Sequence, residues 1–282
     1  MSEYFSWRKM KKKDVPAVEM FLRAIEKKYV SACGRFLSRD LSKDPVWFLR
    51  GRKGEIAGLI VNFGSTLIPV LCEKKEIPVP KFLKRFFNKK KIHSVQGLKE
   101  EVIFIQQALD KKSGKIAEII DYELMDIDKC PQKEGFSSGP SNLILRVPSL
   151  VDVDALAPLQ AGYEREEVIP KGSTFSPASS RVNITNIISS GQILAAEISG
   201  RLVGKINVSY ASFTRYLIGG VYVHPDFRSL GIARRMTTEF TASLIGEGKG
   251  VTLFVKKSNL AARRLYTGIG FSVKDDYRIT YY

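Results

Sequence analysis

The sequence is poor in cysteine and histidine. It contains 3 cysteines and 2 histidines in 282 residues. Cys33, Cys72 and Cys130 are odd in number and widely spaced, which excludes a disulfide framework and a clustered zinc site and is typical of a reducing compartment. We therefore expect a cytoplasmic location and no metal cofactor.

The sequence also has little continuous apolar character. Its longest uncharged stretch, residues 56–72, is shorter than the roughly 20 residues that a membrane-spanning helix needs, and polar residues interrupt it. We interpret this stretch as two buried strands. The N-terminus opens with charged residues and has no signal-peptide pattern. We expect no membrane association.

Acidic residues are scarce relative to basic ones, and the net charge is +16. Residues 1–140 carry 28 lysines and arginines against 18 acidic residues, while residues 141–282 carry 17 against 11. Two basic clusters lie at 8–13 and 81–91, the second interleaved with phenylalanines. Such clusters bind an anionic partner, for example nucleic acid, or form the solvated face of an amphipathic helix. Because no nucleic-acid motif accompanies them, the solvated face is the favoured interpretation.

The composition that remains is that of a globular chain, with 44% hydrophobic and 26% charged residues, which excludes wholesale disorder and fibrous repeats. The length suits two domains. Residues 131–141 are rich in proline, glycine and serine, as linkers are. We therefore predict domains at 1–130 and 142–282, joined by a linker at 131–141.

Hydrophobic periodicity and turn residues predict alternating helices and strands, and hence an α/β fold of the α+β kind. In the first domain we expect helices near 14–28, 31–41, 81–89 and 98–111, and strands near 46–50, 56–61, 66–71 and 116–125. In the second we expect strands near 143–147, 194–198, 202–210, 215–223 and 251–255, and a final strand or hairpin at 271–282. Its helices are expected near 152–168, 179–189, 231–246 and 260–267. A weak similarity between Gly54–Val61 and Gly200–Asn207 suggests a duplicated unit.

The most informative segment is a strand, a short loop and a helix between residues 215 and 246. Pro225 ends the strand, since proline cannot donate to a strand ladder. Gly231 and Ala233 leave the first helical turn open, so an anion can approach the free backbone N–H groups and the positive end of the helix dipole. Arg228 and Arg234 add guanidinium groups suited to phosphate. This pattern predicts a pyrophosphate-binding loop that is neither a Walker A loop nor a dinucleotide fingerprint.

The segment Val223-x-Pro225-x-x-Arg228-x-x-Gly231-x-Ala233 resembles the acyl-CoA signature of the GCN5-related N-acetyltransferases, the GNAT superfamily. A second motif, from Asn259 through Tyr266 to Gly270-Phe271, is similar to the later pattern of the same family. The resemblance covers about residues 141–282. It implies tandem GNAT-like domains, each a mixed, mostly antiparallel twisted sheet flanked by helices, with the acyl-CoA site in the C-terminal one.

The resemblance also assigns roles to individual residues. It implies acetyl-CoA as co-substrate, and direct attack of a primary amine on the thioester without a covalent enzyme intermediate. Tyr266 matches the general acid that protonates the CoA thiolate. The residues implied to bind the cofactor are Val221, Val223, Arg228, Ser229, Leu230, Gly231, Ile232, Ala233, Arg234, Asn259, Ala262 and Tyr266.

The general base is not assigned by the resemblance. Many family members carry a glutamate on the strand before the loop, whereas this chain has Leu217-Ile218-Gly219-Gly220 there. The nearest acids are Glu164, Glu166 and Glu167, of which Glu164 and Glu167 are our candidates; the alternative for all three is a solvated turn. The sequence does not name the amine acceptor.

The first 130 residues resemble an N-terminal domain of unknown function found before some bacterial GNAT domains. They lack a phosphate loop, so we expect a degenerate GNAT-like domain that does not bind CoA. The leading prediction is an acetyltransferase. The alternative is a noncatalytic acyl-CoA sensor whose basic N-terminal half binds a partner. The sequence leaves the oligomeric state open, with a homodimer as one alternative.

Overall fold

The computed structural model describes residues 5–40, 43–51, 54–72, 92–108, 115–131, 139–170 and 172–282. The predicted helix at 81–89 and its basic cluster lie outside these residues. The chain divides into two compact units. Unit 1 contains Met1–Leu124, Phe254–Ser258 and Lys274–Tyr282, and unit 2 contains Met125–Leu253 and Asn259–Val273. The chain therefore enters unit 1 three times, and its last residues belong to the unit in which it began.

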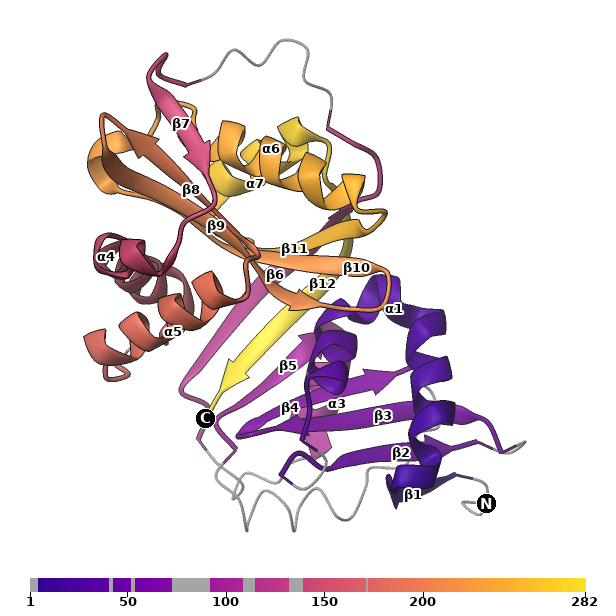
Figure 1. The fold of residues 1–282 in the computed structure, drawn as a ribbon. Helices are drawn as coiled ribbons and strands as arrows, with labels where there is room; N and C mark the ends of the chain where they lie inside the picture. The colour runs from indigo at the N-terminus through magenta and orange to yellow at the C-terminus, as the bar shows by residue number, and fades with distance from the viewer. Residues whose placement is uncertain are drawn as a thin grey trace. The chain divides into compact units, whose positions relative to one another are not determined.

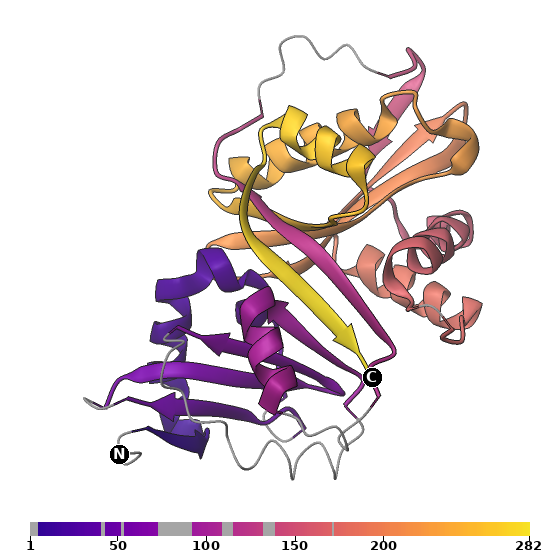
Figure 2. The same cartoon turned by 180° about the vertical axis from the view of Figure 1, so that it is seen from behind.

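Unit 1 is built on a mixed sheet with helices on both faces. Its strand order is β1-β2-β3-β4-β5-β12, and all neighbours are antiparallel except β4 and β5. The helices α1 and α3 lie on opposite faces of this sheet (Figures 1 and 2). The elements are β1 (Ser6–Lys9), α1 (Val15–Leu37), β2 (Val46–Arg50), β3 (Ile56–Phe63), β4 (Thr66–Leu71), β5 (Ser94–Leu98), α3 (Lys99–Ala108), β6 (Glu118–Ile127) and β12 (Ser272–Tyr281).

The two helices predicted over 14–28 and 31–41 form one element, α1, with a break at Tyr29. This residue has non-helical backbone angles, and its hydroxyl donates a hydrogen bond of 2.6 Å to the buried Glu101 of α3. Glu101 also accepts the backbone N–H of Leu71, at 2.8 Å. One buried carboxylate thus joins the kink of α1 to the end of β4, a contact that helical periodicity does not encode.

The C-terminal strand completes the sheet of unit 1. β12 pairs antiparallel with β5, from Tyr277 opposite Leu98 to Tyr281 opposite Ser94. Arg278 on β12 donates to both carboxylate oxygens of Asp121 at 2.7 and 3.0 Å. These bonds hold the pKa of Asp121 at about 2, with Lys99 contributing. Sequence proximity placed these residues in the second domain, whereas hydrogen bonding places them in unit 1.

In unit 2 the strands of the sheet follow the order β11-β10-β9-β8-β7. β10 and β11 are parallel, and the other neighbours are antiparallel. The helices α4 and α5 cover one face of this sheet, and α6 and α7 the other (Figure 1). The elements are β7 (Leu143–Arg146), α4 (Val153–Tyr163), α5 (Pro177–Ser189), β8 (Ile193–Ile198), β9 (Arg201–Ala211), β10 (Arg215–Val223), α6 (Ile232–Gly246), β11 (Gly250–Lys256) and α7 (Leu260–Ile269).

The helix predicted over 152–168 has a more detailed form. A 3-10 turn at Leu150–Asp152 precedes α4, and a π-helical turn at Glu164–Val168 follows it. π-Turns are rare and occur often at functional sites, because the extra residue redirects side chains. Here that turn carries Glu164, Glu166 and Glu167, and so both candidate bases.

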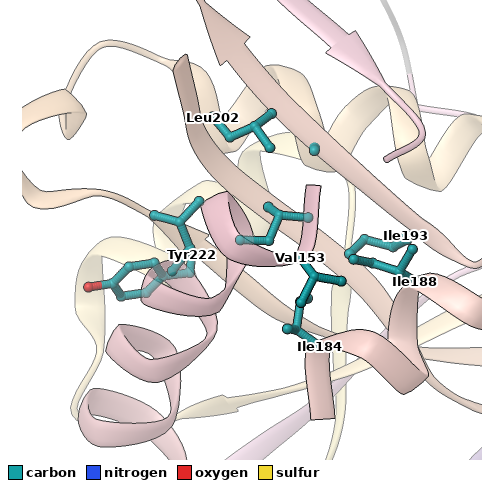
Figure 3. Close-up of a cluster of buried hydrophobic side chains, with 9 residues drawn as sticks. Val153, Ile184, Ile188, Ile193, Leu202 and Tyr222 are labelled. Atoms are coloured by element: carbon teal, nitrogen blue, oxygen red, sulfur yellow. The ribbon is translucent and has the colours of Figure 1, made fainter. Parts of the chain in front are cut away.

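An aliphatic core packs α4 and α5 against the sheet of unit 2. Val153, Ile184, Ile188 and Leu202 lie in this core, while the ring of Tyr222 packs at its margin with the hydroxyl directed away from it (Figure 3). Buried aliphatic side chains of this size each stabilise a fold by about 1.5–3 kcal/mol. The core fixes the position of α4, and therefore of the π-helical turn that follows it.

Candidate functional site

The loop between β10 and α6 has the backbone shape of an anion-binding turn. A 3-10 turn at Pro225–Phe227 ends at Arg228, and Ser229 and Gly231 have positive φ angles of 64° and 77°. Gly231 is the N-cap of α6 in the left-handed conformation, which glycine adopts without steric cost. The first turn of α6 therefore begins at a residue without a side chain, and its N–H groups are open to a ligand.

Arg228 connects this loop to the π-helical turn. Its Nη2 donates to both oxygens of Glu166, at 3.0 Å each, and its Nε donates to the backbone oxygen of Val223 at 3.1 Å. The hydroxyl of Tyr222 donates to the same carboxylate at 2.9 Å. The arginine predicted to hold pyrophosphate is thus paired with an acid that could exchange for a phosphate group.

The three glutamates of the π-helical turn have different hydrogen-bond partners. Glu164 is buried, and its carboxylate accepts hydrogen bonds from Gln160, Ser180 and Asn183. Glu167 accepts a bond of 3.3 Å from the Nδ2 of Asn259. The solvated turn that was the alternative interpretation is wrong for Glu164, because three donors from α4 and α5 surround it.

The N-terminus of α7 brings together the residues of the second motif. The Oδ1 of Asn259 accepts the backbone N–H of Ala262 at 3.1 Å, so Asn259 caps α7 while its Nδ2 holds Glu167. Tyr266, about two turns beyond Asn259 along α7, is 7% exposed. Burial raises its pKa above the ordinary tyrosine value, and Tyr163 and Glu167 raise it further. The hydroxyl is therefore protonated at neutral pH, as a proton donor must be.

The remaining cofactor residues of the prediction follow the loop into α6. Val221 and Val223 lie at the end of β10, Leu230 is exposed, and Ile232 is buried beneath the helix start. Ala233 and Arg234 form the first turn, where the guanidinium of Arg234 lies against Gly268 of α7. Arg234 thus connects the start of α6 to α7.

A buried lysine that the sequence prediction did not select lies beside this site. Lys205 on β9 is fully buried, and its Nζ donates to the Oδ1 of Asn207 and to the backbone oxygen of Gly220, both at 3.0 Å. The amine also lies 4.9 Å from the centre of the Tyr163 ring. Burial lowers its pKa to about 7, against an opposing effect of Glu164. The signal in the sequence was a lysine within the apolar segment Leu202–Val208.

β10 has a bulge where it passes Lys205. Gly219 pairs with Asn207 and Tyr222 with Lys205, so two residues of β10, Gly220 and Val221, lie opposite one residue of β9. Gly220 has a φ of 62°, and a Cβ there would lie 2.6 Å from the Lys205 Nζ and 2.0 Å from the Asn207 Oδ1. Only glycine fits at position 220. Bulges of this kind redirect a strand and are frequent next to active sites.

The segment Leu217-Ile218-Gly219-Gly220 of β10, on the strand where many family members carry a glutamate, contains no acidic side chain. Among the residues that the structure describes, no cluster of three histidine, cysteine or acidic side chains is arranged to hold a metal ion. Within the same residues, none of the helices combines the length and apolar character needed to cross a bilayer.

Comparison with known proteins places these motifs in one family. Residues 163–271 match the family model described as the acetyltransferase (GNAT) family. An acetyltransferase of Yersinia enterocolitica is 31% identical over 85 residues, and one of Pectobacterium atrosepticum is 32% identical over 85 residues. Each alignment covers 29% of this chain and 58% of the relative, so the chain spans somewhat more than half of these relatives.

Solved structures are similar over the whole chain. A GCN5-related N-acetyltransferase from Sphaerobacter thermophilus has a TM-score of 0.65 at 19% identity, covering 99% of this chain and 95% of that one. A tandem GNAT protein from the clavulanic acid biosynthesis pathway has a TM-score of 0.61 at 13% identity, covering 98% and 97%. At these identities the likeness is one of fold. The predicted α/β fold with mixed sheets and a tandem arrangement is confirmed.

Proposed function

We propose that this chain, whose residues 163–271 match the acetyltransferase (GNAT) family model, is an N-acetyltransferase that transfers the acetyl group of acetyl-CoA to a primary amine. The observation that carries this proposal is the loop of Arg228–Gly231 at the start of α6, with Tyr266 buried on the adjacent α7. The backbone N–H groups of the loop and α6 bind the pyrophosphate, together with Arg228 and Arg234. The end of β10, at Val221–Val223, holds the pantetheine arm and the thioester.

The proposed mechanism is direct transfer. An uncharged amine attacks the thioester carbonyl, the carbonyl oxygen gains negative charge, and the C–S bond breaks as Tyr266 protonates the departing thiolate. Backbone N–H groups at the β10 bulge stabilise the oxygen, since preorganised donors in a dry site contribute most where charge develops. Of the acids on the π-helical turn, Glu167 is the better candidate base, because its carboxylate is linked to Asn259 and influences Tyr266. Glu164 instead holds α5 through Ser180 and Asn183.

The tandem arrangement supports a separate role for each of the two units. Unit 2 contains the loop and both motifs, and we propose that it binds acetyl-CoA. For unit 1 we propose a role in recognising the acceptor. The described part of unit 1 contains no loop with the Arg228–Gly231 pattern, and this agrees with a unit that does not bind CoA.

The experiment is thiol release from acetyl-CoA against a panel of amines, polyamines, amino acids and peptides. An acetyltransferase releases CoA only in the presence of an accepted amine, and mass spectrometry detects the acetylated product. The noncatalytic alternative remains a sensor of acyl-CoA, which would bind acetyl-CoA in a thermal-shift assay yet release no thiol with any amine. If acetyl-CoA neither binds nor is consumed, both proposals fail.

A further inference from the structure

The bulge in β10 leaves one peptide group, between Gly220 and Val221, outside the regular pairing of the sheet. β10 pairs with β11 only from Arg215 to Ile218 among the described residues. Its pairing with β9 passes directly from Gly219 to Tyr222. The Gly220–Val221 peptide therefore lies at the point where β10 and β11 separate, and where the proposed function places the thioester.

Lys205 fixes the orientation of this peptide group. Its Nζ donates to the Gly220 oxygen at 3.0 Å, and the Asn207 Oδ1 at 3.0 Å holds the amine in place. The backbone of Gly220 also forms a hydrogen bond with the hydroxyl of Tyr163. The Gly220–Val221 peptide is trans, like the other peptides of the described residues, so the N–H of Val221 points in the direction opposite to the Gly220 oxygen, away from Lys205.

A donor at the carbonyl end of a peptide strengthens its N–H end. Hydrogen bonds in a chain polarise one another, and the effect is greatest where water is absent. Lys205 is 0% exposed, so its amine acts on the Gly220 oxygen without competition from solvent. The ionisable groups that face the amine are Tyr163 and Glu164, from α4 and the π-helical turn. No carboxylate forms an ion pair with it among the described residues, so the peptide oxygen is its main acceptor besides Asn207.

We propose that Lys205 is a positioning residue for acetyl transfer: it orients and polarises the Gly220–Val221 peptide so that the Val221 N–H stabilises the charge on the thioester oxygen. This inference rests on the proposed function. It adds a residue that acts on the thioester through the Gly220–Val221 peptide and not by direct contact. Lys205 does not touch the substrate itself, because its amine is enclosed by Gly220, Asn207 and Tyr163. The three residues Lys205, Asn207 and Gly220 depend on one another. The amine bonds the Asn207 side chain and the Gly220 oxygen, and only glycine leaves room for both at position 220.

The test uses the full-length protein and does not depend on the acceptor. Glycine followed by valine occurs only twice in the chain, at 220–221 and 250–251. Labelling glycine carbonyls with ¹³C and valine nitrogens with ¹⁵N therefore selects two amide signals in a carbonyl-filtered NMR spectrum, and Val221→Ile identifies one of them. The Val251 signal is the internal control, since its peptide lies in the same unit.

Three results are expected without any ligand. In the wild type, the Val221 N–H signal moves with pH along a single titration near neutrality, as the lysine loses its proton. In Lys205→Met it lies upfield and does not titrate. The Val251 signal is the same in both proteins. A Val221 signal that lies at the same place in the wild type and in Lys205→Met overturns the inference. If Lys205→Met fails to fold, a wild-type Val221 signal that does not move over the whole pH range in which the lysine loses its proton overturns it as well.

A second arm separates this inference from the proposed function. Acetyl-CoA should shift the Val221 signal downfield, and CoA, which lacks the thioester, should not. The Val221 signal could differ between the wild type and Lys205→Met and yet shift equally with acetyl-CoA and with CoA. In that case the proposed function places the thioester wrongly, and the catalytic part of the inference is wrong as well. With an accepted amine, Lys205→Met should lower kcat about tenfold, less than the 10²–10³ of a lost oxyanion donor, with the Kd for acetyl-CoA unchanged. An unchanged kcat would also overturn the catalytic part.

Discussion

Arg228 and Glu166 form a two-bond ion pair, 62 residues apart in sequence, between the β10–α6 loop and the π-helical turn. Both side chains are nearly half exposed, so exchange with an anionic ligand requires little desolvation. In the proposed function, the pyrophosphate replaces Glu166 as the partner of Arg228. The pair keeps the guanidinium at the loop before the ligand arrives.

Glu166→Gln should therefore tighten acetyl-CoA binding. An exposed ion pair contributes about 0–1 kcal/mol, so the Kd should fall by up to about fivefold. Isothermal titration calorimetry at low and moderate salt measures this change. Glu239→Gln is the matched control, since Glu239 pairs with Arg235 on α6 in a similar way. Weaker binding in Glu166→Gln would mean that Glu166 supports the bound state.

Gly231→Asp should abolish acetyl-CoA binding, because it places a carboxylate where the pyrophosphate lies. In the wild type, a ligand at 100 times its Kd adds about 2.7 kcal/mol to the free energy of unfolding, which raises the melting temperature. Gly231→Asn keeps the size of the side chain and tolerates a positive φ, so it should retain more of the shift. Gly246→Asp, at the far end of α6 with open space around it, should bind normally. Wild-type affinity in Gly231→Asp would refute the loop assignment.

Tyr266→Phe should lower kcat by about 10²–10⁴, the usual effect of losing a positioned acid, and leave the Kd for acetyl-CoA nearly unchanged. The ring is retained, so its edge-on packing against Phe271 persists. Steady-state kinetics with an accepted amine measures the effect. Tyr216→Phe removes a hydroxyl that bonds Glu247 at the start of β10 and should leave kcat unaffected. Equal rates for wild type and Tyr266→Phe, with chemistry limiting, would leave Tyr266 a purely structural residue.

Lys205 should make stability depend on pH in a specific window. Its pKa is about 7 in the folded protein and 10.5 ordinarily, so between these values the unfolded chain binds a proton that the folded chain has released. The free energy of unfolding therefore rises as the pH increases from about 7 to about 10.5. Below pH 7 the contribution of Lys205 to this free energy is at its lowest. The slope approaches about 1.4 kcal/mol per pH unit. Urea unfolding of wild type and Lys205→Met at several pH values gives the difference, in which other groups cancel. A difference that stays constant with pH would show that the Lys205 amine keeps its ordinary pKa in the folded protein.

Local patterns determined part of this structure. The strand predicted at 215–223, the proline that ends it, the glycine at 231 and the amphipathic α6 all follow from the sequence, because each depends on neighbours within a few residues. The cap of α7 by Asn259 is of the same kind. The order and spacing of these residues along the chain are therefore enough to locate the loop and its motifs.

Long-range packing decided the rest. No local rule separates Glu164, Glu166 and Glu167, and their different partners come from α5, the β10–α6 loop and α7. The C-terminal strand has an ordinary strand pattern, and only hydrogen bonding to β5 assigns it to unit 1. Lys205 is one of many lysines in the chain, but tertiary packing buries its amine against the Gly220 oxygen. The sequence by itself determined which elements form and where the loop between β10 and α6 lies. The tertiary structure decided which distant side chains meet, because such contacts join residues that are far apart along the chain.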